Sequence, residues 1–281
     1  MSFVLLNNQI TTRENVKIDM EDRGYNFGDG IYEVIPIYDS KTFSMDEHLQ
    51  RFEESAAKIE IKLPYDKSLL KRLLNDLKEK NNITNGIIYI QMTRGVSPRA
   101  HLYERNVEGL ITGFCREMPF PVEQKHSGIN VFLTADIRWL RCDIKTINLL
   151  GNTMVKRKAT DENCHEAIMH RDGTLTEGSS SNLFIVKDKI LYTHPATNLI
   201  LNGITRQKVI KLANENDLTV VEETFTLKQL READEAFITS TTQEITPITS
   251  VFGDIQANFT VGPITKALQQ FFKECVEKEA I

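Results

Sequence analysis

Apolar residues recur at helical spacing in the early part of the chain. A first stripe, whose members are three or four residues apart, consists of Leu49, Phe52, Ala56 and Ile59. This spacing places the side chains on one face of an α-helix and predicts that the face packs on a core. Ser44 followed by Glu47 is typical of a capping box and predicts that the helix begins there. Pro64 ends the segment. A second helix is predicted from Leu69, Leu70, Leu73, Leu74 and Leu77.

Short runs rich in β-branched and aromatic residues predict strands. The clearest runs are Ile87–Thr93, Leu110–Phe114 and Ile129–Thr134. Asp172-Gly173 predicts a hairpin turn within residues 167–175, a further strand pair flanks Lys187-Asp188, and another strand ends at Ser240. Later helices are predicted near residues 152–162 and from Thr205. A last helix from Pro263 is predicted to turn inward the apolar residues Ile264, Leu268, Phe271 and Phe272.

The order of these elements indicates the fold class. Hairpins alternate with separate helices, which favours an α+β fold over a parallel doubly wound sheet. Pro119 and Pro121 interrupt any regular element, because proline restricts its own backbone and that of the residue before it. Residues 119–122 are therefore predicted to connect a smaller α+β domain at 1–118 to a larger one at 123–281, which would carry Lys145.

Composition and charge exclude several classes of protein. The chain has 281 residues, of which 41% are hydrophobic and 26% charged, as in an ordinary globular protein. A net charge of -5 gives no basic surface for nucleic acid. No apolar run approaches the roughly 20 residues that span a membrane, and the first residues lack the pattern of a secretion signal. We expect a cytoplasmic protein that binds neither nucleic acid nor membrane.

Cysteines and histidines give no sign of a metal site. The four cysteines are scattered and form no CxxC pair, so we expect unpaired thiols. His165 and His170 are five residues apart, which does not place them on one helical face. The sequence also lacks a GxxxxGK[ST] phosphate loop, a GxGxxG dinucleotide loop and a GxSxG nucleophile elbow.

One lysine lies where burial is expected. Lys145 stands within the largely apolar tract 137–151. Burial disfavours the charged form of lysine and lowers its pKa, and an uncharged amine can form a Schiff base. The alternative is that the side chain extends to the surface and keeps its charge.

Two segments near predicted strands are candidates for binding a substrate. The glycine-rich stretch 23–33 contains Tyr32 at the start of an apolar strand. Arg99 and His101 follow another strand, and alternate residues of an extended backbone point to one side. Such a pair can bind a carboxylate, because arginine is a forked donor that keeps its charge. A solvated loop with incidental charges is the alternative.

Three further segments combine polar side chains with turns. The stretch 176–184 brings Glu177 together with three serines and an amide, next to an apolar strand. Residues 202–206 at a helix start, and residues 240–242 after a strand, resemble anion-binding backbone supported by hydroxyl groups. Together with Lys145 these parts suit an aldehyde cofactor with a cationic ring and a phosphate.

These segments resemble the signature of the class IV, or fold-type IV, pyridoxal-phosphate aminotransferases. The signature begins with Glu177, continues through Asn182-Leu183-Phe184 and Thr193, and ends in 201–206. Nearly end to end, the chain is most similar to the D-amino-acid members of that family. The stretches that carry this similarity are 21–25, 27–30, 97–101, 138–145, 176–182, 239–242 and 244–247.

The resemblance implies a two-domain α+β fold, a homodimer and an active site between the domains, with pyridoxal 5'-phosphate as cofactor and no metal. Lys145 would hold the cofactor as a Schiff base and move the proton at the substrate α-carbon, and Glu177 would pair with the pyridine nitrogen. The other residues that it implies for the cofactor are Arg51, Leu201, Ile204, Thr205, Ser240 and Thr241. Those that it implies for the substrate α-carboxylate are Tyr32, Arg99 and His101, the last two from the partner subunit.

The implied reaction is transamination between a D-amino acid and a 2-oxo acid. D-alanine and 2-oxoglutarate would give pyruvate and D-glutamate. Branched-chain L-amino-acid aminotransferases and aminodeoxychorismate lyases share the lysine and the glutamate, so these two activities are alternatives, and the Arg99–His101 pair favours the D-specific one. A non-catalytic dimer that binds the cofactor is a further alternative, against which an intact Lys145 argues.

Overall fold

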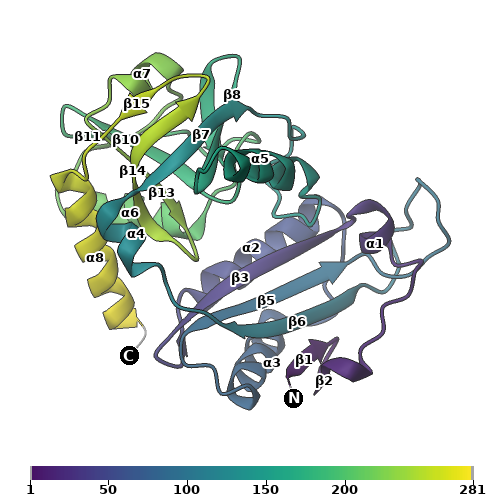
Figure 1. Cartoon of the computed structure of the whole chain (residues 1–281). Helices are drawn as coiled ribbons and strands as arrows, with labels where there is room; N and C mark the ends of the chain where they lie inside the picture. The colour runs from purple at the N-terminus through teal and green to yellow at the C-terminus, as the bar shows by residue number, and fades with distance from the viewer. Residues whose placement is uncertain (1, 280–281) are drawn as a thin grey trace. The chain divides into compact units, whose positions relative to one another are not determined.

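The computed structural model describes residues 2–279 and has the α+β fold that the sequence predicted (Figure 1). Its contacts divide the chain into two compact units. The first contains the residues up to Pro119 together with Ile144–Leu149, and the second contains Phe120–Asp143 and Leu150–Lys278. No helix within residues 2–279 is long and apolar enough to cross a membrane.

The first unit is built on a six-stranded antiparallel sheet in the order β2-β1-β6-β5-β3-β4. Its strands are β1 (Phe3–Leu6), β2 (Gln9–Thr12), β3 (Gly30–Tyr38), β4 (Lys41–Thr42), β5 (Gly86–Thr93) and β6 (Leu110–Glu117). Its helices are η1 (Arg13–Asn15), α1 (Arg23–Phe27), α2 (Met45–Lys58) and α3 (Lys67–Lys80). The predicted stripe of α2 packs on β3, and that of α3 packs on β1 and β6. Both belong to one buried core, which includes Leu49, Leu70, Leu74, Ile35 and Ile88.

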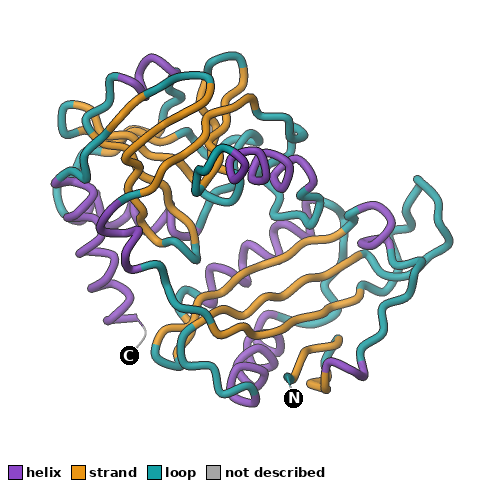
Figure 2. The backbone as a smooth tube through the Cα atoms, in the orientation of Figure 1, coloured by secondary structure: helices purple, strands orange, loops and turns teal. Residues whose placement is uncertain are grey.

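The second unit contains a nine-stranded sheet in the order β12-β11-β10-β13-β14-β7-β8-β9, with β15 paired to β14. Strands are drawn in orange in Figure 2. Strand β7 runs parallel to both β8 and β14. The strands are β7 (Ile129–Ala135), β8 (Glu166–Arg171), β9 (Thr174–Gly178), β10 (Asn182–Lys187), β11 (Ile190–Thr193), β12 (Val220–Glu222), β13 (Glu235–Ser240), β14 (Glu244–Gly253) and β15 (Ala257–Asn258). The helices are α4 (Val122–Ser127), α5 (Leu150–Asp161), α6 (Ile204–Glu215), α7 (Leu227–Arg231) and α8 (Pro263–Glu279).

The predicted elements of this second unit are present. Strands β8 and β9 form the hairpin that turns at Asp172-Gly173, and β10 and β11 form the pair expected around residues 187–188. In α8 the stripe is buried most fully at Leu268 and Phe272, with Ile264 and Phe271 at its half-buried edges.

The capping box expected at Ser44 is wrong, although the helix begins where predicted. Ser44 has a left-handed backbone with φ 54° and makes no side-chain hydrogen bond to the start of α2. A capping serine needs an extended backbone to bring its hydroxyl back to the first helical turn. The sequence pattern was present, but the tight turn before α2 fixes a different backbone.

The segment around Lys145 packs differently from the expected division of the chain. The first change of unit falls at Pro119, next to the connector predicted at 119–122. Residues 144–149, however, group with the first unit and not with the larger second unit that was expected to carry the lysine. The division into domains at 1–118 and 123–281 stays a prediction. In the structure, the backbone of Lys145 is hydrogen-bonded to strand β3 of the first sheet.

Candidate active site

The Lys145 segment pairs with the first residues of strand β3. Tyr32 N donates to the Lys145 carbonyl at 2.9 Å, and Lys145 N donates to Ser55 Oγ at 3.3 Å. The side chain of Lys145 is half-buried, and its Nζ lies 4.4 Å from the centroid of the Tyr32 ring. An aromatic face attracts a cation at this distance. The structure thus brings together two residues that the sequence assigned to one site.

A buried ionic cluster lies on the other side of strand β3. Glu33 Oε1 accepts from Arg51 Nε at 2.6 Å and Glu33 Oε2 accepts from Arg51 Nη2 at 2.9 Å, the forked geometry of a strong arginine–carboxylate pair. His48 Nδ1 lies 2.8 Å from the same Oε2. Arg51 was expected to bind a phosphate, and its guanidinium is anchored by this glutamate.

The cluster shifts the pKa of its members. Burial alone would raise the pKa of Glu33, but Arg51 and His48 outweigh it and hold that pKa well below its usual range. Burial lowers the pKa of His48 despite the neighbouring carboxylate. The sequence interpretation missed both residues. A charged residue inside the apolar run 31–37 was the signal that could have indicated Glu33.

Arg99 and His101 gather on one aromatic ring. The guanidinium carbon of Arg99 lies 5.1 Å from the centroid of the Phe27 ring, and the His101 ring lies 5.9 Å from it at a steep angle. Both side chains are exposed. Both side chains therefore contact the same ring, although residues 99–101 form a bend and not the extended backbone that the alternation assumed.

Asp29 anchors the loop that carries this pair. Its Oδ2 accepts from Arg23 Nε at 2.9 Å and from Arg94 Nε at 2.8 Å. Arg23 Nη1 in turn donates to the carbonyl of Ala100 at 2.7 Å, between the two candidate residues. Because both arginines are almost fully buried, the loop is attached to a rigid base.

Glu177 is the centre of a buried hydrogen-bond network in the second unit. Its Oε1 accepts from Arg138 Nη1 at 2.6 Å. Its Oε2 accepts from Asn182 Nδ2 at 2.9 Å and from the backbone N of Leu201 at 3.0 Å. Glu177 is only 5% exposed, so the orientation of its carboxylate is fixed by these donors.

The charge state of Glu177 depends on Arg138. Burial raises the pKa of Glu177, and the Arg138 guanidinium opposes that rise. Arg138 is itself held by Asp136, which accepts from its Nη2 at 2.8 Å. The sequence interpretation used Arg138 only as part of a matching stretch and did not give it a role.

The start of helix α6 has donors suited to an anion. Its N-cap is Gly203, which has no side chain to bond the first N–H groups, so those of Ile204 and Thr205 are available. A Cβ on Gly203 would lie 2.2 Å from Asn182 Oδ1, so only glycine lets the amide approach the helix start. Leu201, assigned to the cofactor ring, accepts from Asn182 Nδ2 at 2.8 Å through its carbonyl.

The turn after strand β13 supplies further hydroxyl groups. Ser240 ends the strand, and its Oγ accepts from Gln243 N at 3.1 Å, which closes the turn that contains Thr241. Strand β13 packs against α6 and pairs with β10, with Thr239 opposite Asn182. Among the residues that the structure describes, the buried Thr239 Oγ1 has no hydrogen-bond partner.

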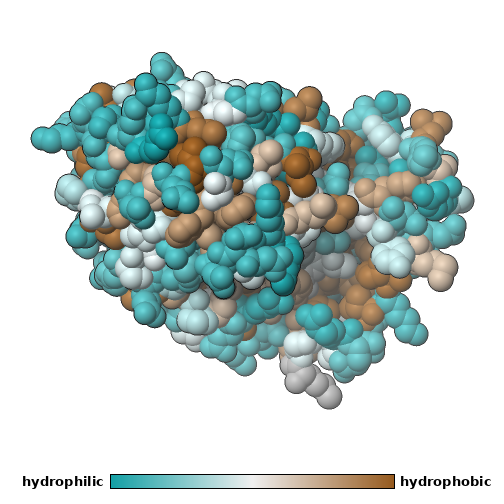
Figure 3. Space-filling view, turned by 45° about the horizontal axis from the view of Figure 1, so that its top comes forward, coloured by the Kyte–Doolittle hydropathy of each residue, from teal (hydrophilic) through white to brown (hydrophobic). Residues whose placement is uncertain are grey.

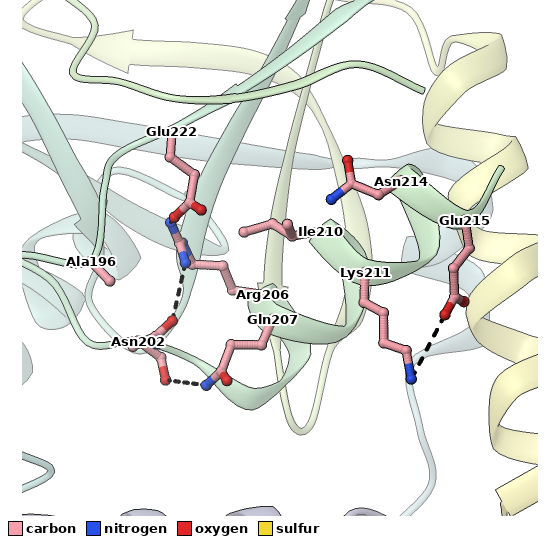
Figure 4. Close-up of a pocket in the computed structure, with 9 residues that line it drawn as sticks. All are labelled: Ala196, Asn202, Arg206, Gln207, Ile210, Lys211, Asn214, Glu215 and Glu222. Carbon is pink, nitrogen blue, oxygen red and sulfur yellow. Dashed lines mark hydrogen bonds and ion pairs between the residues drawn. The ribbon is translucent and has the colours of Figure 1, made fainter. Parts of the chain in front are cut away.

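A surface hollow of about 690 Å³ lies along α6 (Figure 4). Arg206, the last residue of the signature, crosses it and donates to Asn202 Oδ1 at 3.0 Å and to Glu222 Oε2 at 2.6 Å. None of the residues that we assigned to cofactor or substrate lines this hollow. Arg206 therefore ties together the segments around the helix, and the hollow is not the candidate active site.

Comparisons with known proteins identify the family of the chain. The sequence matches the family Amino-transferase class IV over residues 30–251. The D-alanine aminotransferase of Listeria monocytogenes serotype 4b is 50% identical over 274 residues, which cover 96% of this chain and 95% of that protein. The D-alanine aminotransferase of Staphylococcus haemolyticus is 44% identical over 281 residues, the full length of both.

A solved structure shows the same fold. The branched-chain aminotransferase of Thermoproteus uzoniensis, solved with norvaline, has a TM-score of 0.91 and 27% sequence identity, and the match covers 99% of this chain and 95% of that one. Lys145, Glu177 and the start of α6 all lie within the residues that match the family. The chain belongs to the class IV aminotransferases, enzymes of fold type IV.

Proposed function

We propose that this chain is a D-amino-acid aminotransferase that moves the amino group of D-alanine to a 2-oxo acid such as 2-oxoglutarate, giving pyruvate and D-glutamate. The observation that carries the substrate class is the 50% identity, over nearly the whole chain, to a D-alanine aminotransferase. The exposed Arg99–His101 pair on Phe27 supports it, since these side chains suit a carboxylate. A cytoplasmic location stays a prediction from the sequence.

Enzymes of fold type IV use pyridoxal 5'-phosphate, and the second unit fits the two polar ends of that molecule. A carboxylate has about four acceptor positions. The hydrogen bonds of Glu177 to Arg138, Asn182 and Leu201 leave room for one more donor, such as a protonated ring nitrogen. The uncapped helix start at Gly203 suits the phosphate, because its N–H groups and the helix dipole favour an anion.

When bound, the cofactor supplies an aldehyde that takes up the amino group and a cationic ring that draws electrons from the substrate α-carbon. Lys145 holds it through Nζ. Lys145 Nζ would also take the proton from the substrate α-carbon and later return it, as general base and general acid. The ring of Tyr32 keeps Nζ in one place between these steps.

The remaining residues bind and orient. Glu177 would keep the ring nitrogen protonated, with its carboxylate held in place by the hydrogen bond from Arg138. Leu201 would pack against the ring. Ile204 and Thr205 at the helix start and the hydroxyl groups of Ser240 and Thr241 would bind the phosphate. The resemblance also assigns Arg51 to the phosphate, and Glu33 orients its guanidinium.

The substrate α-carboxylate is bound by the Tyr32 hydroxyl together with Arg99 and His101 of the partner subunit of a homodimer. Support comes from exposed apolar side chains on the segments around that pair, namely Ile18, Met20, Tyr25, Val96 and Leu102. On the face shown in Figure 3, hydrophobic side chains form small groups in a largely hydrophilic surface. Large exposed apolar side chains near one another are typical of a protein interface.

A direct assay tests the substrate class. Purified protein loaded with cofactor is given 2-oxoglutarate and either D-alanine, L-leucine or L-valine, and the product 2-oxo acid is measured. We expect kcat/KM for D-alanine to exceed that for either L-amino acid by at least about tenfold, the effect of one charged contact. Faster use of L-leucine or L-valine would replace this proposal with a branched-chain activity.

Arg99→Ala is expected to lower kcat/KM for D-alanine about 10- to 100-fold, because a charged contact to the carboxylate contributes roughly 1.5–3 kcal/mol. His101→Ala should cost less, since a histidine is largely neutral near pH 7. Arg116→Ala is the matched control, because Arg116 is also exposed and its guanidinium carbon lies 5.6 Å from the centroid of the Phe114 ring. The cofactor spectrum should stay unchanged in all three variants.

Mixing subunits tests which chain supplies Arg99. Random pairing of Lys145→Ala with Arg99→Ala subunits makes half of the dimers mixed, and each mixed dimer has one site with both groups. We therefore expect about a quarter of the wild-type sites to recover. If mixed dimers form and no activity returns, Arg99 acts in its own subunit.

A further inference from the structure

Glu166 is a buried carboxylate that the proposed mechanism does not use. It is the first residue of strand β8 and has no exposed surface. Its Oε1 accepts from Ser179 Oγ and, at 2.7 Å, from Ala167 N. Its Oε2 accepts from Ser180 Oγ at 3.1 Å and from Ser181 Oγ at 3.2 Å. Three successive hydroxyl groups therefore converge on one side chain.

The hydroxyl groups compensate for burying this charge. Lys156 Nζ is 3.7 Å from Oε1, and its side chain is 40% exposed, so it is a weak partner. A buried carboxylate is costly unless donors surround it, and a carboxylate only accepts hydrogen bonds. Each serine hydroxyl must therefore donate its proton to Glu166. The three hydroxyl groups of the loop are thus held in a single orientation.

The backbone of this loop is equally constrained. Gly178 N donates to the Ser181 carbonyl at 2.7 Å, and Ser179 N donates to the Ala167 carbonyl at 3.0 Å. A Cβ on Gly178 would lie 2.1 Å from Ser181 Oγ, so a side chain at that position would displace the serine from Glu166. The loop is thus closed on itself and attached to the start of β8.

The loop begins after Glu177, which we propose pairs with the cofactor nitrogen, and ends at Asn182, which is hydrogen-bonded to that glutamate. Asn182 Nδ2 donates to Glu177 Oε2 at 2.9 Å. Any movement of the loop changes the spacing of these two groups. We propose that Glu166 is a positioning residue for transamination, which fixes the serine loop and through it the orientation of the Glu177 carboxylate. This inference rests on the proposed function.

Glu166→Gln tests the role, with Glu235→Gln as the matched control. Glutamine keeps the shape but replaces one acceptor oxygen by a donor, which opposes the serine protons. Glu235 is also buried, at 4% exposure, and it accepts from Ile264 N at 3.0 Å and from Thr265 N at 2.8 Å. It therefore reports what losing a buried carboxylate does to stability where neither Glu177 nor the serine loop is its partner.

We expect both variants to lower the Tm. Only Glu166→Gln should lower kcat with D-alanine by about tenfold, with KM changed less than twofold, and speed the loss of pyridoxal phosphate from the dialysed holoenzyme by about tenfold. If kcat and the rate of cofactor loss were equal in the two variants, Glu166 would have a structural role only and the proposal would be wrong. Because cofactor loss needs no turnover, it tests Glu166 even if D-alanine proves not to be a substrate.

If Glu166→Gln does not fold, Ser181→Ala tests the same proposal. It removes one of the donors to Glu166 and leaves the carboxylate in place. We expect the same pattern at a smaller scale, with kcat lowered and cofactor loss accelerated by about two- to threefold. Wild-type values for both quantities in Ser181→Ala would contradict the proposal.

Discussion

Lys145→Ala is expected to reduce transamination of D-alanine by more than about 10³-fold, because a positioned general base contributes up to about 10⁴-fold and here the same amine also holds the cofactor. The aromatic contact with Tyr32 places Nζ, and alanine removes that amine. We would measure kcat with D-alanine and 2-oxoglutarate. The mass of the borohydride-reduced protein would report whether the cofactor is covalently attached.

Lys158→Ala is the control for this experiment. Lys158 Nζ also lies against an aromatic ring, 5.1 Å from the centroid of Phe132, and donates to Thr134 Oγ1 at 3.1 Å. Removing it should leave turnover and the covalent mass within twofold of wild type. A cofactor still reduced onto the Lys145→Ala chain would show that another amine holds it.

Glu177→Gln should lower the single-turnover rate with D-alanine by about 10²- to 10³-fold, the usual effect of removing a fixed charge opposite one that develops during the reaction. The amide can keep accepting from Asn182 or Leu201, so the fold is expected to hold. It cannot supply the negative charge that keeps a ring nitrogen protonated. Rapid-mixing absorbance with D-alanine measures the proton-abstraction step directly.

Two comparisons make this second result specific. Glu235→Gln removes a buried carboxylate from the same unit and should leave the single-turnover rate unchanged. In Glu177→Gln the cofactor content should stay at the wild-type level, which would show that cofactor binding survives. An unchanged rate in this variant would assign protonation of the ring nitrogen to a different group.

Local patterns predicted most elements of the fold. The leucine stripe of α3 and the Asp-Gly turn between β8 and β9 were correct because periodicity and turn chemistry act over a few residues. The capping box predicted at Ser44 was wrong because the backbone conformation there depends on residues outside the pattern. The turn after β4 gives Ser44 a left-handed backbone, and the four-residue pattern of a capping box carries no information about that turn.

The site was predicted less completely than the fold. Lys145 and Glu177 stood out as charged groups in apolar or glycine-rich surroundings, whereas their supporting partners come from distant positions. Arg138 is 39 residues from Glu177, and Glu166 is 13 residues from the first of its serines. The sequence analysis noted the three serines beside Glu177 but gave none of them a role. The structure shows that their protons point to a carboxylate of the protein.

The position of segment 144–149 in the sequence affects how the first unit folds during translation. The segment completes the edge of β3 in the first unit, yet the ribosome synthesises it only after the first part of the second unit. Translation adds about 5–20 residues per second. Residues 144–149 are therefore synthesised seconds after the part of the first unit that ends at Pro119. A nascent chain stalled near Pro119 would hold a sheet without the Lys145 segment. Chaperones that shield unpaired sheet edges should therefore act on this intermediate longer than on a domain encoded in one continuous stretch.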